Sequence, residues 1–224
     1  MKLFTTSDIH GNTKIMTKLR EVAKKCDLLF VCGDIGGKNI CGKSFMEFSM
    51  YQRRDAFFLN ELMHGWMSEY PVATRFILGN DDWFEFSGES YLAQPEIIGG
   101  YNFIPFEFVL ITPFNTNREV NENKLRYELS KLNADSNTII VAHTPPSGCG
   151  DKIFSGGRVG SRAVYNWIEE KQPKIWLCGH IHEDYSAHEI GKTRVFNCAC
   201  DHTEDVLRGW LIDLDTMEYE RIVL

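Results

Sequence analysis

The chain has 224 residues, and its 43% hydrophobic and 25% charged residues match an average soluble globular protein. That composition can fill a core, which excludes the disordered and fibrous classes. The 31 acidic and 24 basic residues leave a net charge of −7, and the basic residues are scattered along the chain. We therefore expect no extended nucleic acid as a partner.

Membrane and disulfide-rich classes are also excluded. No stretch approaches the ~18 consecutive apolar residues of a membrane-spanning helix, and the first residues turn polar before a signal peptide could form. We therefore expect a cytoplasmic protein with no membrane contact. The seven cysteines form no Cys-x-x-Cys pair, and without an export signal they predict no disulfide framework.

Short apolar runs alternate with segments of helical spacing over most of the chain. One helical pattern begins at Ile15, with Asn12 or Thr13 placed to cap it. Further helices are expected within residues 51–70 and at residues 159–171. Strands are expected at residues 2–7, 28–32, 72–78, 108–112, 138–142 and 174–178. Strands that alternate with amphipathic helices predict an α/β layered sheet.

After residue 185 the pattern changes to short strands joined by turns. These strands are expected at residues 187–190, 194–197, 210–213 and 218–223. We interpret this tail as an antiparallel section that completes the same domain. The whole chain, residues 1–224, is then expected to form one domain.

Polar residues follow the ends of five predicted strands. They are Asp8 with His10, Asp34, Asn80 with Asp81 and Asp82, His143, and His180 with His182. The carboxyl ends of strands in an α/β sheet form the crevice where ligands bind. Each short motif alone is also explained by a turn, a helix cap or a buried loop histidine. Coincidence explains their joint occurrence poorly, so the sequence predicts one shared site.

This set of side chains suits transition-metal ions. Imidazole and carboxylate groups favour Mn, Fe, Co or Zn, whereas the near absence of thiolates disfavours a closed structural zinc site. Asp8, Asp34, Asn80 and the four histidines offer seven ligands, which is more than one tetrahedral ion needs. We therefore expect two divalent ions that share a carboxylate. Such a pair clamps a phosphate and lowers the pKa of a bound water.

The ordered motifs resemble those of the calcineurin-like metallophosphoesterase superfamily, and the resemblance extends from Asp8 to His182. It implies an α/β fold, a two-sheet αββα sandwich with the metal site at the carboxyl ends of the strands. It implies that the first metal is held by Asp8, His10, Asp34 and His182. The second would be held by the bridging Asp34 with Asn80, His143 and His180. The segments around His143 and His180 are similar to the small phosphodiesterases related to the mammalian metallophosphoesterase-domain proteins.

Five residues near these motifs need separate interpretation. Asp81 stands where the family often has a histidine that contacts phosphate, and a carboxylate there repels an anion unless it is protonated or turned away. Asp82 stands at the family's acidic position, which implies that it orients a histidine ligand. Arg158 is either a substrate contact or a solvated loop arginine. Trp83 and Phe84 either line a base or aryl pocket or pack in the core.

We hypothesise a dinuclear metal-dependent phosphoesterase that hydrolyses small phosphodiesters, or phosphomonoesters, by attack of a metal-bound hydroxide. Asn80 and His180 would contact the phosphate, and with Asp81 they form the expected catalytic set. Mn is the working choice of metal, with Fe, Zn, Co and Ni as alternatives. The expected partner is a small phosphoester, with nucleotides as one class. The competing interpretation is a non-catalytic scaffold that keeps the fold, and the oligomeric state stays open.

Overall fold

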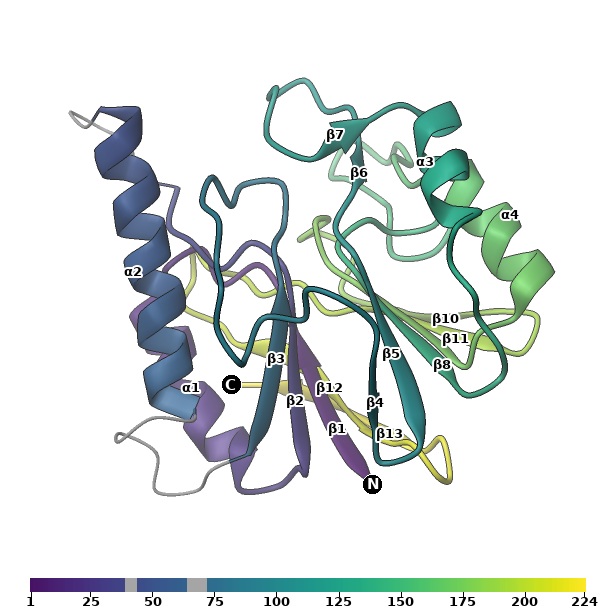
Figure 1. Cartoon of the computed structure of the whole chain (residues 1–224), viewed down its shortest axis with the longest axis horizontal. Helices are drawn as coiled ribbons and strands as arrows, with labels where there is room; N and C mark the ends of the chain where they lie inside the picture. The colour runs from purple at the N-terminus through teal and green to yellow at the C-terminus, as the bar shows by residue number, and fades with distance from the viewer. Residues whose placement is uncertain (39–43, 64–71) are drawn as a thin grey trace.

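The computed structural model describes residues 1–38, 44–63 and 72–224. Within these ranges, two β-sheets pack face to face, and each outer face is covered by two helices (Figure 1). The layers therefore follow one another as helix, sheet, sheet and helix. This architecture confirms the predicted αββα sandwich.

The first sheet has the strand order β13-β12-β1-β2-β3. Its members are β1 (Lys2–Thr6), β2 (Leu28–Cys32), β3 (Ala73–Ile77), β12 (Arg208–Asp213) and β13 (Tyr219–Val223). The strands β1, β2 and β3 run parallel, so their carboxyl ends share one edge of the sheet. Every residue of β2 is buried, which explains why this strand appears in the sequence as a continuous apolar run.

The second sheet has the strand order β10-β11-β9-β8-β5-β4. Its members are β4 (Glu96–Ile98), β5 (Tyr101–Phe106), β8 (Thr138–Ala142), β9 (Ile175–Cys178), β10 (Ala187–Ile190) and β11 (Thr193–Asn197). Its four central strands are parallel, and the two edge strands are antiparallel to their neighbours. Two further short strands, β6 (Val109–Leu110) and β7 (Glu119–Val120), form a separate ribbon.

Hydrophobic side chains fill the three spaces between the four layers. The rings of Phe30 and Phe103 stack between the two sheets with 4.8 Å between their centroids. The outer face of the first sheet packs against α1 (Thr13–Ala23) and α2 (Phe45–Met63). The outer face of the second sheet packs against α3 (Glu122–Leu129) and α4 (Arg162–Lys171).

Three helices begin at residues whose side chains cap the helix N-terminus. Asn12 caps α1 as expected, accepting from the backbone N–H groups of Lys14 and Ile15. Helix α2 begins earlier than predicted, because Ser44 and Glu47 accept from each other's backbone N–H groups in a capping box. Helix α4 begins three residues later than predicted, at the Ser161 cap. The part of the second predicted helix at residues 64–70 lies outside the described residues.

Several strand predictions need correction. The strand predicted at residues 108–112 is only two residues long, since the Glu119 carboxylate accepts from the Thr112 N–H and hydroxyl group and ends the pairing. The predicted tail is not one antiparallel section. Its first hairpin joins the second sheet through a parallel pairing of β11 with β9, and its second hairpin joins the first sheet. The sequence patterns missed β4, β5, β7 and α3 altogether.

Replacing Asn12 with Ala should lower the free energy of unfolding by about 1–2 kcal/mol, measured by urea denaturation. The Asn12 side chain caps α1 and also donates to the His202 carbonyl oxygen and the Asp205 carboxylate. Asn121→Ala is the matched control, because Asn121 caps α3 through one N–H group. A larger loss in Asn121→Ala than in Asn12→Ala would contradict the double role of Asn12.

Candidate metal centre

All seven predicted metal ligands converge where the carboxyl ends of the two sheets meet. Asp8 and His10 follow β1, Asp34 follows β2, Asn80 follows β3, His143 follows β8, and His180 with His182 follows β9. The Asp8 carboxylate lies 3.2 Å from the His182 ring and 4.0 Å from the His143 ring. The Asp34 carboxylate lies 3.3 Å from His143 and 3.7 Å from His10. The structure therefore brings these side chains together at one place.

The turns after the strands force the chain into an uncommon backbone conformation. Asp8, His10, Asp34 and His180 all have positive φ angles, of 59°, 48°, 52° and 71°. Side-chain-bearing residues adopt the left-handed region rarely, and such conformations cluster at binding and catalytic sites. The turns are held together by backbone hydrogen bonds, including His10 N to Asp34 O at 2.9 Å and Asp8 N to Gly33 O at 3.1 Å. Strained turns therefore aim these side chains at one point.

The glycines that precede three of the ligands allow the motifs to approach each other. A Cβ atom on Gly33 would lie 2.6 Å from the His143 ring, and one on Gly79 would lie 2.5 Å from the Asp34 backbone nitrogen. A Cβ atom on Gly179 would lie 2.6 Å from the Ser7 side chain. Glycine at these positions therefore lets the motifs pack closely, because any side chain would push a neighbouring motif away.

Each central carboxylate has one oxygen fixed by a backbone N–H group, and its other oxygen faces histidine rings. One oxygen of Asp8 accepts from the His180 backbone N–H at 2.9 Å, and one oxygen of Asp34 accepts from the Asp81 N–H at 2.8 Å. The remaining Asp8 oxygen is buried and has no hydrogen-bond partner. Both carboxylates are almost fully buried, so a positive charge beside them would offset a large desolvation cost.

Two further ligands have the orientation that metal binding requires. The Nδ1 atom of His143 lies 2.7 Å from the Cys32 carbonyl oxygen, which assigns the proton to Nδ1 and leaves Nε2 as a free acceptor. The side-chain amide of Asn80 donates to Thr116, which leaves its Oδ1 atom buried without a partner. Both ring nitrogens of His10 also lack partners. These orphaned donor atoms fit a divalent metal centre.

The electrostatics of the cluster favour positive charge. Burial opposes ionisation of Asp34, but His143 and His10 hold its pKa well below the usual value. Burial also opposes charge on His143, yet Asp34 and Asp8 raise the pKa of its ring to about 10. Burial and the neighbouring His143 lower the pKa of His180 to about 4. The space between the two aspartates therefore attracts a cation, which either a proton or a metal ion can supply.

Asp81 has an ion-pair partner that the sequence patterns did not indicate. Its carboxylate lies 2.9 Å from the Lys38 ammonium group, and both side chains line the same cavity as Asp34. The pairing offsets the negative charge that would otherwise repel a phosphate. Asp81 therefore does not have to be protonated or turned away to tolerate a nearby anion, because the Lys38 ammonium group balances its charge.

Asp82 acts on backbone groups and not on a histidine ring, which corrects the expectation for this residue. Its carboxylate accepts from the N–H groups of Ile35, Gly36 and Gly79 at 2.8–3.2 Å. It thereby ties the turn after β2 to the turn after β3. Burial and the nearby Asp34 raise the pKa of Asp82 to about 7.

Arg158 and the two aromatic candidates lie away from the cluster. The Arg158 guanidinium pairs with the buried Asp151 carboxylate at 2.7 Å and does not line the cavity described below. Phe84 is buried in the core beside α1 and α2, and Trp83 packs edge-on against Phe45. Phe84 therefore packs in the core, whereas Trp83 is half-buried beside helix α2, and neither residue lines the cavity.

A cavity of about 930 Å³ opens above the cluster. Asp34, Asn80, Asp81, His180 and His182 lie at its base. One wall is apolar and carries Leu110, Ile111, Pro113, Phe114, Ile153, Phe154 and Val159. Phe114 and Phe154 are 79% and 93% exposed, so two aromatic rings of the cavity lining are open to solvent.

The structure adds two residues to the site that the sequence analysis missed. His202 comes from the loop between β11 and β12, and Lys38 lies just beyond the turn after β2. Neither residue directly follows a predicted strand, which was the signal used to select candidates. His202 lies between the strands expected at residues 194–197 and 210–213, in a segment to which the sequence patterns assigned no function.

Comparison with known proteins agrees with this geometry. A family model described as a calcineurin-like phosphoesterase superfamily domain matches residues 1–200. The chain therefore belongs to the calcineurin-like phosphoesterase superfamily, a family that implies phosphoester hydrolysis and divalent metal ions. The resemblance inferred from the motifs is confirmed.

The individual proteins that resemble this chain have low sequence identity to it. The uncharacterized protein MJ1162 of Methanocaldococcus jannaschii is 28% identical over 203 residues, which are 88% of this chain and 87% of that protein. The UPF0046 protein T07D4.2 of Caenorhabditis elegans is 36% identical over 70 residues, 30% of this chain and 18% of that protein. The structure of TT1561 of Thermus thermophilus has a TM-score of 0.64 at 14% identity, covering 99% of this chain and 97% of that chain. This last likeness is one of fold.

Replacing Gly79 with Ala should weaken both the fold and the metal centre. The added methyl group would overlap the Asp34 carboxylate and its backbone nitrogen, so the turns after β2 and β3 must separate. We expect the free energy of unfolding to fall by about 1–3 kcal/mol in urea denaturation. We also expect the variant to lose cobalt binding, as measured by calorimetry.

Gly157→Ala is the control, since its nearest neighbours would lie at an ordinary 3.6 Å from the new methyl group. Cobalt affinity of Gly79→Ala equal to that of the unaltered protein would show that the close approach is not required.

Proposed function

We propose that this protein is a dinuclear metal-dependent phosphoesterase that hydrolyses small phosphodiesters in preference to monoesters. The observation that carries the proposal is the pair of buried carboxylates, Asp8 and Asp34, each with one oxygen fixed by a backbone N–H and the other directed at histidine rings. Membership of the phosphoesterase superfamily supports the same reaction class.

The residues divide between two ions around the Asp34 carboxylate. One ion would be held by Asp8, His10, Asp34 and His182, and the other by Asp34, Asn80, His143 and His180. Bound there, two divalent ions would offset phosphate charge and lower the pKa of a water molecule. Mn remains our working choice, and Fe, Zn, Co and Ni suit the same donor set.

The protein side chains position the phosphate and limit its charge. Asn80 and His180 lie at the base of the cavity, where a phosphate would contact them. Thr116 accepts from the Asn80 amide and so keeps its Oδ1 atom turned toward the site. Lys38 offsets the charge of Asp81 at the same cavity. We infer that Asp81 holds Lys38 in place beside the phosphate and acts on substrate through it.

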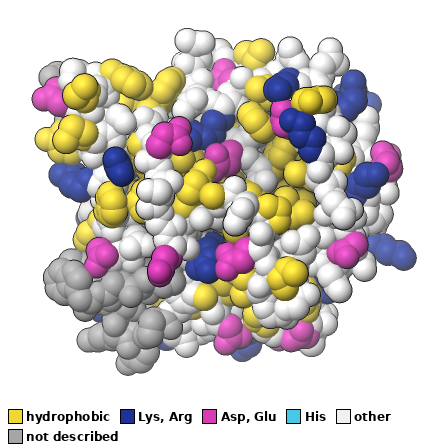
Figure 2. Space-filling view, viewed as in Figure 1, with side chains coloured by type: hydrophobic (Ala, Val, Ile, Leu, Met, Phe, Trp, Pro, Cys, Tyr) yellow, Lys and Arg dark blue, Asp and Glu magenta, His cyan; other side chains and the backbone are white. Residues whose placement is uncertain are grey.

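The apolar wall supports the preference for diesters. A diester carries a second organic group on its phosphate, and Phe114 and Phe154 present exposed rings on which a nucleobase or aryl group can stack. Basic and acidic side chains are interspersed over the face in Figure 2 and form no continuous basic stripe there. Both observations support a small substrate over extended nucleic acid.

Among the described residues, no helix is long and apolar enough to cross a membrane.

The first test is hydrolysis of bis-p-nitrophenyl phosphate beside p-nitrophenyl phosphate by metal-stripped protein reloaded with Mn, Co, Ni, Zn or Mg. We expect reloading to restore diester cleavage and Asp34→Asn to reduce it by a factor of roughly 1,000 or more, since this residue would help to hold both ions. His180→Ala should lose most activity as well.

His188→Ala serves as the control, because His188 lies on β10 and bonds to Ser186, away from the cluster. Absence of turnover with every metal, in protein that binds two ions per chain, would reject the enzyme and favour the scaffold interpretation.

Replacing Lys38 with Met should raise KM for the diester about tenfold, because the Asp81 carboxylate then faces the anionic substrate unpaired. The double variant Lys38→Met with Asp81→Asn should recover part of this loss, since it removes the repelling charge. Steady-state kinetics at low ionic strength measure both. Lys192→Met, on the exposed turn between β10 and β11, is the matched charge control. An unchanged KM in Lys38→Met would show that the ion pair does not face the substrate.

A further inference from the structure

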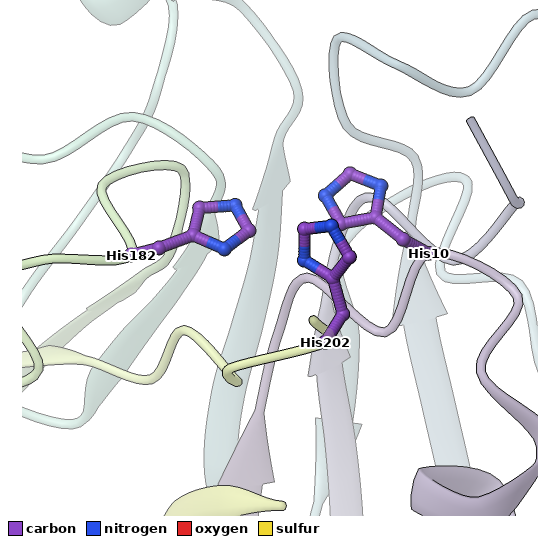
Figure 3. A group of neighbouring side chains, drawn as sticks. All are labelled: His10, His182 and His202. Carbon is purple, nitrogen blue, oxygen red and sulfur yellow. The ribbon is translucent and has the colours of Figure 1, made fainter. Parts of the chain in front are cut away.

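His202 completes a cluster of three histidine rings at the rim of the candidate metal centre (Figure 3). Its ring centroid lies 4.3 Å from that of His10 and 5.0 Å from that of His182. One ring nitrogen from each residue lies within 4.8 Å of those of the other two. In Figure 3, His182 approaches from the side opposite His10, and His202 lies between their chain segments with its ring beside that of His10.

The nitrogens of this cluster are available to a ligand. The Nδ1 atom of His202 is buried without a hydrogen-bond partner, and so are both ring nitrogens of His10. Buried polar atoms without partners are rare in native proteins, and a bound ion or water molecule is one way in which they are satisfied. Carboxylates already face two of the rings, since Asp8 lies 3.2 Å from His182 and Asp34 lies 3.7 Å from His10. The bound group that suits this environment is a cation.

The loop that carries His202 is fastened to the segment that carries His10. The His202 carbonyl oxygen accepts from the Asn12 side chain at 2.9 Å. Asp205, on the same loop, accepts from Asn12 at 2.7 Å, and the loop closes on itself through two hydrogen bonds between Asp201 and Val206. The position of His202 is therefore set by the fold and not by a freely moving chain.

We propose that His202 is a third imidazole ligand of the ion held by His10 and His182. Three nitrogens bound to one ion at ~2.1 Å cannot all lie more than ~3.6 Å apart, so ring nitrogens that are now within 4.8 Å of one another must move inward by roughly 1 Å to coordinate the ion. This extra nitrogen makes the donor set softer, which favours Co, Ni, Zn or Fe over Mg. The inference rests on the proposed metal centre and is independent of which phosphoester the enzyme cleaves.

The test compares the unaltered protein with His202→Ala and His202→Phe. Each metal-stripped protein is titrated with Co²⁺ and followed by calorimetry and by visible absorption, which reports the ligands around the ion. The Phe variant keeps an aromatic ring against His10 and removes both nitrogens. If His202 is a ligand, both variants should bind Co²⁺ at least about tenfold more weakly at one of two sites, with a changed spectrum.

The inference fails if His202→Phe keeps the affinity and the spectrum of the unaltered protein, because His202 would then act by ring packing alone. It also fails if both variants keep them and only KM rises, because His202 would then be a substrate contact. His188→Phe is the matched control and should leave the titration unchanged.

Activity is measured separately on the same samples. Weaker Co²⁺ binding in the His202 variants of a protein that cleaves no phosphoester would retain this inference and reject the proposed function. Full activity of the unaltered protein with unchanged Co²⁺ binding in the variants would retain the proposed function and reject this inference.

Discussion

Burial of two carboxylates at the junction of two sheets is the constraint on which this structure depends. Asp8 and Asp34 are 0% and 2% exposed, and buried negative charge is costly unless it is paired and hydrogen-bonded. Each carboxylate uses one oxygen for a backbone N–H, which fixes its direction. The other oxygen requires positive charge, and the surrounding histidines create a place for it.

The contacts that build the site also join the sheets. Asp8 follows a strand of the first sheet and accepts from the backbone of His180, which follows a strand of the second. His143 lies 2.7 Å from the Cys32 carbonyl oxygen across the same junction. Function and stability are coupled here, because a change that moves one ligand also loosens the contact between sheets. This coupling explains why glycine is required where the motifs meet.

Above the junction, the cavity has two chemically different sides. The base carries the ligands together with the Lys38–Asp81 ion pair, and the wall carries exposed apolar side chains such as Phe114 and Phe154. The departure from the family pattern at Asp81 has a local solution in this arrangement, since a lysine four residues beyond Asp34 supplies the missing charge. A charged base beside an apolar wall suits a phosphate that carries an organic group.

Much of the fold followed from local sequence patterns. Continuous apolar runs predicted β2 and β8, and the cap and spacing at Asn12 predicted α1. Strand β4 was missed because it is only three residues long and has no buried position, and β5 was missed because its buried positions do not alternate along the strand. The start of α2 was missed although Ser44 and Glu47 carry the capping-box signal.

The sequence by itself predicted the seven residues of the candidate metal centre, because residues that follow parallel strands of one sheet meet at the same edge. Only the tertiary structure decided how the two edges face each other and what else lies between them. His202, Lys38 and the apolar wall come from loops, whose positions depend on long-range contacts such as Asn12 with His202 and Lys38 with Asp81. No local periodicity encodes such contacts, since they form between segments that are distant in the chain.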